Sequence, residues 1–427
     1  MVYNAPQQER GYTHHMADKY SVRNFLTCIY GYTFFNATML LAPVYAVFMQ
    51  SRGVSDFGIS VLLMLWSGGV LVTQFPVAHL ARRLGAKHVL FTGQVLKAAA
   101  FILWILWPTF AGFAVGMLLW GIHGAIYNVV SEDVLYDELR ARTNTLAYER
   151  ILGRRKNVAA IGTAVSSAGS LLWVWGYEWI TALSIVSLAL SMLFISRMNL
   201  IQKYRGIADN GCSVIKSICG AVSVMRATPM IVTMLVLCVL VTNFSYLNDY
   251  LALIGYDIGV PASYIGAVPF FIMACQVVGQ AFAHKFVGMS PMIMYVMIMV
   301  AGAFFGLFAL DYTIWGLVAL GAGYVICAVI KILLYARFQN LIPSQNRMEV
   351  LSFYSIADQT SYMIICLVIG LGSMLGSWRN SIAILAVLLV SLGGWAMIFA
   401  RRRAARRATM PNPTPNTTVR PYGGEIA

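Results

Sequence analysis

The chain has 427 residues, of which 59% are hydrophobic and only 11% are charged, and its formal net charge is +14. Because soluble proteins average about 25% charged residues, this composition excludes an ordinary soluble domain and indicates an integral membrane protein. The alternating ten-residue segments typical of an outer-membrane barrel are not visible, so we expect an all-α fold.

Residues 1–22 are polar, lack the apolar core and cleavage site of a secretory signal, and are predicted to form a cytoplasmic tail. Twelve apolar segments follow, and each has at least the roughly 20 residues that a helix needs to cross a bilayer. The segments are 23–49, 57–80, 88–107, 110–136, 145–175, 178–197, 229–254, 261–284, 290–310, 312–337, 350–375 and 380–400. We therefore predict twelve transmembrane helices.

The longest polar interruption, residues 198–228, divides these segments six and six. It is expected to be a cytoplasmic loop between an N-terminal six-helix half, residues 23–197, and a C-terminal six-helix half, residues 229–400. Residues 401–427 are rich in arginine and then in proline, asparagine and threonine. This composition predicts a disordered basic cytoplasmic tail.

The orientation follows from the lysines and arginines, since 26 of the 30 lie on the side of the N-terminus in this topology. The positive-inside rule then places both termini in the cytoplasm. The same asymmetry explains the net charge, so we expect no nucleic-acid partner. The most charged passage, residues 131–156, is predicted to be a loop between helices, with the six cations from Arg140 to Lys156 in water or among lipid headgroups.

Catalytic machinery is not expected. The seven cysteines fall in predicted helices or in the inner loop, which argues against structural disulfides. The sequence has no paired CxxC, zinc-spaced cluster, Walker lysine loop or GxSxG motif. We therefore predict no metal, no cofactor and no enzyme activity.

Residues 78–87, AHLARRLGAK, resemble the signature of the major facilitator superfamily, which is written G-x-x-x-D-R-x-G-R-K. Arg83, Gly85 and Lys87 match this signature, whereas Arg82 replaces its aspartate. The related stretch 279–288, GQAFAHKFVG, occupies the corresponding place in the second half. The resemblance implies two parallel six-helix halves, alternating access and a monomer.

Residues 133–155 resemble a second pattern, found in a branch of bacterial facilitators. The matching residues are Tyr136, Asp137, Leu139, Gly153 and Arg154. This resemblance implies a multi-pass protein of the bacterial cytoplasmic (plasma) membrane. It also implies a cytoplasmic gate built from Arg82, Arg83, Gly85, Lys87, Asp137 and Arg154. The alternative is that these charges only fix the topology.

Polar residues near the predicted midplane are candidates for a substrate cavity, because ionisable or polar groups within a bilayer usually face a cavity or a partner. They are Asn36, His123, Tyr127, Asn243, Gln276 and Tyr324. In the resembling fold, helices 1, 4, 7 and 10 line the central cavity. His123 could carry a proton, because an imidazole titrates near neutral pH, or it could be a hydrogen-bonded packing residue.

The candidates for proton coupling are Glu132, Asp133, Asp249, Asp358 and His123. Glu132 and Asp133 are adjacent, so at most one of them faces the cavity. Asp249 lies near the outer end of its helix and could alternatively be a solvated helix end. Lys331 and Asp358, in consecutive helices, are expected to form an ion pair. Lys97 either snorkels or contacts a polar group such as Gln74.

Small residues recur in segment 145–175, at Gly153, Gly162, Ser166, Ser167, Gly169 and Ser170. They loosely resemble the glycine-rich motif of drug/proton antiporters, and they also suit close helix packing. The leading hypothesis is a secondary transporter that exports an amphipathic or drug-like small molecule in exchange for protons. The alternatives are uptake or export of a polar metabolite or siderophore, and a non-transporting membrane scaffold or receptor.

Overall fold

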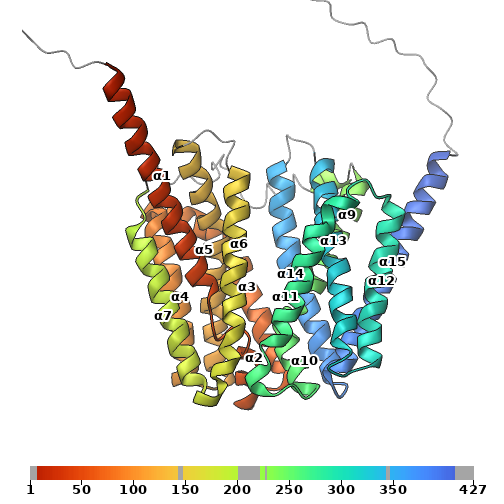
Figure 1. The fold of residues 1–427 in the computed structure, drawn as a ribbon. Coiled ribbons are helices and arrows are strands. Elements are labelled where there is room, and N and C mark those ends of the chain that lie inside the picture. Colours follow the sequence, from red (N-terminus) through yellow and green to blue (C-terminus); the bar gives the residue numbers. More distant parts are fainter. Residues whose placement is uncertain (1–6, 143–147, 201–221, 227, 343–346, 409–427) are drawn as a thin grey trace, which may run out of the picture.

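The computed structural model describes residues 7–142, 148–200, 222–226, 228–342 and 347–408, and these residues form a bundle of helices without strands (Figure 1). A first group of helices contains α1 (Gln7–Ala37), α2 (Tyr45–Ser51), α3 (Asp56–Leu84), α4 (Ala86–Leu106), α5 (Phe110–Arg142), α6 (Tyr148–Ser167), the 3-10 helix η2 (Ala168–Trp175) and α7 (Tyr177–Arg197). A second group contains α9 (Pro229–Phe244), η3 (Ser245–Tyr250), α10 (Leu251–Asp257), η4 (Ala262–Tyr264), α11 (Ala267–Phe282), η5 (Ala283–Phe286), α12 (Pro291–Leu310), α13 (Leu317–Leu341), α14 (Arg347–Ser373) and α15 (Trp378–Ala408).

Among the described residues, 11 helices are long and apolar enough to cross a membrane. The predicted first span, residues 23–49, is occupied by α1 and α2 together. The predicted all-α membrane fold is therefore confirmed. Helices cover the predicted apolar spans, because apolar runs of this length have few other solutions in a bilayer.

Two predictions about the connecting segments need correction. Residues 131–156 are not mainly a loop, because α5 continues to Arg142 and α6 begins at Tyr148. The segment 401–427, predicted to be disordered, begins as helix, because α15 extends to Ala408. The N-terminal segment 1–22, for which no secondary structure was predicted, is helical from Gln7 onward. Charged residues favour helix well enough to continue a spanning helix beyond the membrane surface. The remainder of the C-terminal tail and most of the central loop lie outside the described residues.

Several spans are interrupted rather than continuous. The first breaks between Ala37 and Tyr45, around Pro43, whose ring nitrogen has no hydrogen to donate. Side chains satisfy the backbone there: Ser166 Oγ accepts from the Met39 amide at 2.7 Å, and Ser184 Oγ accepts from the Leu41 amide at 3.0 Å. The other breaks are 3-10 stretches: η3 separates α9 from α10, and η2 continues α6. A 3-10 stretch inside a long helix often marks a functional position.

The two groups meet most extensively where α3 packs against α14. Side-chain hydrogen bonds cross this contact, from Ser67 Oγ to Gln359 Oε1 at 2.8 Å and from Ser355 Oγ to Gln74 Oε1 at 2.9 Å. The groups also touch through η2 with η4 and through α2 with α10. In Figure 1, α2 and α10 lie at the end of the bundle opposite to the start of α1 and the end of α15.

Candidate functional site

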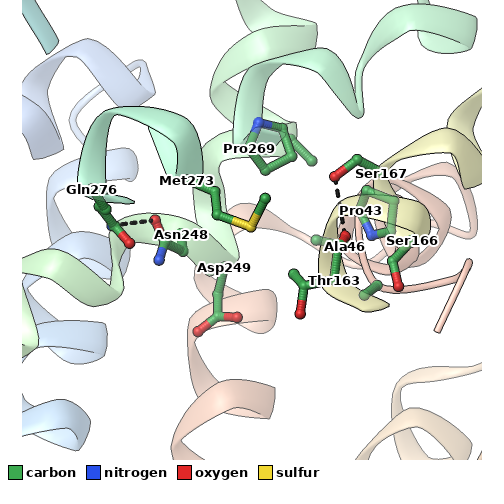
Figure 2. Close-up of a pocket in the computed structure, with 12 residues that line it drawn as sticks. Pro43, Ala46, Thr163, Ser166, Ser167, Asn248, Asp249, Pro269, Met273 and Gln276 are labelled. Carbon is green, nitrogen blue, oxygen red and sulfur yellow. Dashed lines mark hydrogen bonds between the residues drawn. The ribbon is translucent and has the colours of Figure 1, made fainter. Parts of the chain in front are cut away.

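A cavity of about 190 Å³ lies between the two groups, at the places where their helices are interrupted (Figure 2). The first group supplies the α1–α2 break and the end of α6, and the second group supplies η3, α10 and α11. Its lining residues are Ala42, Pro43, Ala46, Thr163, Ser166, Ser167, Asn248, Asp249, Ala252, Pro269, Met273 and Gln276. Interrupted helices bring backbone and short polar side chains to membrane depth, where they are tolerated when they line a cavity.

Asp249 is the charged centre of this site. Its two carboxylate oxygens each accept one tyrosine hydroxyl: Tyr362 donates to Oδ2 at 2.6 Å, and Tyr45 donates to Oδ1 at 3.4 Å. Tyr362 belongs to α14 of the second group and Tyr45 to α2 of the first. The carboxylate therefore bridges the two groups through hydroxyl groups that are themselves buried.

Packing fixes the two tyrosines. The Tyr45 ring lies 5.6 Å from the Trp120 ring and 6.3 Å from the Trp104 ring, while the Tyr362 ring lies 5.8 Å from Trp66. Such aromatic contacts hold a ring while leaving its hydroxyl free to seek a polar partner. Here that partner is Asp249.

A second polar pair lies beside the carboxylate. Gln276 Nε2 donates to Asn248 Oδ1 at 3.3 Å, as the dashed line in Figure 2 shows. On the opposite wall, Ser166 Oγ donates to the Ala37 carbonyl at 2.9 Å, so its hydrogen is already used by the α1 terminus. Of the predicted cavity residues, only Gln276 lines this cavity, and of the predicted coupling residues only Asp249 does.

Asn36 lies instead within a buried polar cluster of the first group. Its side-chain oxygen accepts from Gln94 Nε2 at 3.1 Å and from Lys97 Nζ at 3.2 Å, and its backbone carbonyl accepts from Lys97 at 3.0 Å. The suggested partner of Lys97, Gln74, contacts Ser355 instead. Lys97 is only 4% exposed and does not snorkel, because the last turn of α1 offers it two oxygens.

The other predicted midplane residues are packed inside their groups. His123 is 3% exposed, and its Nδ1 lies 3.1 Å from the Gly93 carbonyl oxygen. Tyr324 is fully buried, with its ring 5.4 Å from Phe305. Tyr127 lies beneath the guanidinium of Arg155, 5.3 Å from its carbon to the ring centroid.

Arg155 overturns the expectation that every cation of the 131–156 passage lies in water or among headgroups. It is 4% exposed. Its Nη1 donates to the Ser131 carbonyl and its Nε to Thr33 Oγ1, both at 3.2 Å, and its Nη2 donates to Ser131 Oγ. The fork of donors on a guanidinium suits this divided set of acceptors, which come from α1 and α5. The neighbouring Arg154 and Lys156 are exposed.

Lys331 and Asp358 lie close enough to interact electrostatically. Asn243 Nδ2 donates to the Asp358 carboxylate at 3.2 Å and to its carbonyl oxygen at 3.1 Å. These three residues come from α13, α14 and α9 of the second group. None of them lines the cavity around Asp249.

The residues predicted as a cytoplasmic gate lie at the end of the bundle away from α2 and α10. Gly85, with a φ of 88°, makes the tight turn between α3 and α4, a backbone conformation that favours glycine. Lys87 Nζ donates to the Ser196 carbonyl near the end of α7 at 2.6 Å. Arg83, Arg154 and Glu132 are exposed, and Arg82, Asp133 and Asp137 are half-buried.

The sequence interpretation missed Tyr45, Tyr362 and Asn248 as site residues. One available signal was the adjacent polar run Asn248, Asp249 and Tyr250 inside an otherwise apolar span. No comparable signal marked Tyr45 or Tyr362, because a tyrosine in an apolar run is compatible with ordinary packing. Close packing is found at Gly162 of α6, where a Cβ would lie 2.7 Å from the Phe34 carbonyl oxygen, but not at Gly153, where nothing lies within 4 Å of a Cβ.

The comparisons with known proteins agree with this architecture. The family model described as Major Facilitator Superfamily matches residues 25–339. No curated protein sequence matches the chain. Among solved structures, the nucleoside transporter NupG is similar with a TM-score of 0.70 and 13% identity, covering 88% of this chain and 99% of that one.

Two further solved structures have the same fold. A D-xylose-proton symporter has a TM-score of 0.68 and 12% identity, covering 88% of this chain and 97% of that one. A POT family transporter in complex with a thioalcohol-conjugated peptide has a TM-score of 0.66 and 13% identity, covering 90% of this chain and 96% of that one. At 12–13% sequence identity, the similarity shows that the chains share a fold.

Proposed function

The chain belongs to the Major Facilitator Superfamily, and from this premise we propose that it is a proton-coupled secondary transporter whose solute binds in the cavity around Asp249. The observation that carries the proposal is the position of this carboxylate. It lies in a cavity between the two helix groups and accepts a hydroxyl from each of them. A multi-pass transporter of this family needs such a site that both groups can close around.

The interface between the groups supports alternating access. Central hydrogen bonds join α3 to α14, whereas η2, η4, α2 and α10 touch at the end beyond the cavity. Rocking about the central contact would separate that end while bringing the opposite ends together. The cavity would then open to each side in turn. The predicted gate residues, from Arg82 to Arg154, would close the opposite end.

Asp249 is the proposed coupling residue. When the carboxylate takes up a proton it loses its charge, and its hydrogen bonds to Tyr45 and Tyr362 weaken, because hydrogen bonds to an ionised acceptor are roughly twice as strong as neutral ones. A proton would thus loosen the bridge between the groups. Asp358, beside Lys331, is the second candidate, but it lies outside the cavity.

For the direction, we propose export of an amphipathic small molecule across a bacterial cytoplasmic membrane, with both termini in the cytoplasm and the monomer as the working unit. The mixed lining supports an amphipathic solute, since Met273, Pro269 and Ala46 line the cavity together with Thr163 and Asn248 (Figure 2). Uptake of a polar metabolite is the second candidate. It is favoured by the Asn248–Gln276 pair, and two structures of the same fold are a nucleoside transporter and a D-xylose-proton symporter.

The test is a proton-gradient assay in everted membrane vesicles that carry the full chain. A transported solute should collapse the gradient with the wild-type protein, and Asp249→Asn should abolish the collapse. The matched control is Asp257→Asn, an exposed carboxylate of the same span whose described partner is the Tyr312 hydroxyl. If Asp249→Asn and Asp257→Asn behave alike, Asp249 is not the coupling residue.

A further inference from the structure

We infer that the solute carries a positively charged amine, which binds the carboxylate of Asp249 in the cavity between the two groups. The inference rests on the proposed function and specifies its substrate class. Among the twelve described residues that line the cavity, Asp249 alone carries a formal charge. The lining therefore offers an anion without a cation, which selects against carboxylate and phosphate solutes.

The buried cations of the first group do not supply the missing charge. Lys97 and Arg155 donate to oxygens of Asn36, Thr33 and Ser131, and neither lines the cavity. The two described contacts of Asp249 are neutral hydroxyls, which orient the carboxylate without supplying a positive charge. A partly buried charge without a counter-ion is costly, so a cationic ligand gains more at this position than a neutral one.

The carboxylate also has room to bind a ligand. An ionised carboxylate offers about four acceptor positions, and the two tyrosines use one on each oxygen. Figure 2 shows Asp249 between the Asn248–Gln276 pair and Thr163, with Met273 and Pro269 above it. An ammonium group can therefore donate to Asp249 while its carbon skeleton packs against Met273 and Pro269.

The size of the cavity limits the solute. Its volume, about 190 Å³, is below the roughly 300–1,000 Å³ of sites for drug-sized ligands. A single ring or a short chain with one amine fits this space. Larger multi-ring drugs do not fit it in this conformation.

The experiment uses three probes with one carbon skeleton: phenethylammonium, 2-phenylethanol and phenylacetate. Their binding to the purified full chain in detergent is measured by calorimetry and by thermal stabilisation. We expect phenethylammonium to bind at least about 10-fold more tightly than 2-phenylethanol, because both can donate a hydrogen bond to Asp249 but only the ammonium also supplies a counter-charge. Phenylacetate should bind most weakly.

Asp249→Asn should remove the preference for the amine, Asp249→Glu should keep it, and Asp257→Asn should match the wild type. Binding of 2-phenylethanol or phenylacetate as tight as that of phenethylammonium would overturn the inference, as would no binding of any probe. So would an amine preference that persists in Asp249→Asn. If this variant does not fold, the ranking of the three probes on the wild type still decides.

The outcome is separable from that of the proposed function. Proton-coupled movement of a neutral or anionic solute in vesicles, without amine binding in detergent, would overturn the amine inference and leave the transporter proposal intact. Tight amine binding without any gradient collapse would overturn the proton coupling and leave the binding site intact.

Discussion

Arg155 shows how a single cation is held inside this protein. Its described contacts are a carbonyl, two hydroxyls and the face of Tyr127, and it is 4% exposed. Burying a charge is costly unless hydrogen bonds replace the water it loses. The stability of the junction of α1, α5 and α6 should therefore depend on Ser131, which supplies two of those acceptors.

We predict that Ser131→Ala destabilises the protein by about 2 kcal/mol, because it leaves part of a buried guanidinium without an acceptor. The measurement is thermal unfolding of the purified protein in detergent. Thr27→Ala is the control, since the Thr27 hydroxyl is exposed and donates to Arg23 within α1. Equal melting temperatures for the two variants would contradict the prediction.

The two tyrosines on Asp249 should contribute unequally. Tyr362 donates at 2.6 Å and Tyr45 at 3.4 Å, and hydrogen bonds weaken with distance. We predict that Tyr362→Phe lowers the melting temperature more than Tyr45→Phe. Both substitutions remove one buried hydroxyl from an aromatic cluster, so each is the control for the other. The reverse order would contradict the ranking of the two hydrogen bonds by distance.

At the level of helices, the approach of α6 to α1 depends on small residues. A Cβ at Gly162 would lie 2.7 Å from the Phe34 carbonyl oxygen and 3.0 Å from the Ala37 Cβ, whereas nothing lies within 4 Å of a Cβ at Gly153. Both glycines belong to α6. Substituting each glycine by alanine therefore gives a matched pair of variants, which measures how much an added methyl group at the α1–α6 contact lowers the stability of the protein.

We predict that Gly162→Ala destabilises the protein by about 1–3 kcal/mol, the usual cost of overpacking. Gly153→Ala should be neutral or slightly stabilising, because alanine favours helix over glycine. Thermal unfolding in detergent measures both variants. A tolerated Gly162→Ala would mean that α1 and α6 separate at little cost.

The helices also show what could be predicted from the sequence. Hydropathy and length located the spans, because apolar runs of this length have to cross the bilayer. They did not locate the break at η3, because hydropathy averaged over a whole span hardly changes with the six residues Ser245–Tyr250. The burial of Arg155 could not be predicted either. It depends on Ser131 and Thr33, and only the packing of three helices brings these residues together.

For the whole molecule, the contacts beyond the cavity determine how readily the two groups separate there. The Tyr250 hydroxyl donates to Ser60 Oγ at 3.0 Å across the boundary between the groups. Gly266 is needed nearby, because a Cβ at this residue would lie 2.1 Å from the Ser167 carbonyl oxygen. Both contacts favour the conformation described here, in which this end is closed.

We predict that Tyr250→Phe speeds amide hydrogen exchange in η2 and η4 by about fivefold, because a neutral hydrogen bond contributes about 1 kcal/mol. Exchange at the opposite ends of α3 and α14 should not change. Tyr312→Phe is the control, since the Tyr312 hydroxyl donates to Asp257 within one group. If amides in η2 and η4 exchange at the same rate in Tyr250→Phe and in the wild type, the Tyr250–Ser60 hydrogen bond does not help to keep this end closed.

The helix breaks also have a consequence for how the protein is made. α2 and α10 have seven residues each and are about 10 Å long, too short to span about 30 Å of hydrocarbon. Each therefore has to enter the bilayer together with the helix before it. The cavity takes residues from Ala42 to Gln276, so it is complete only after the chain has been made through Gln276. A solute that binds there can stabilise the protein only late in its synthesis, and the early helices have to remain inserted without it.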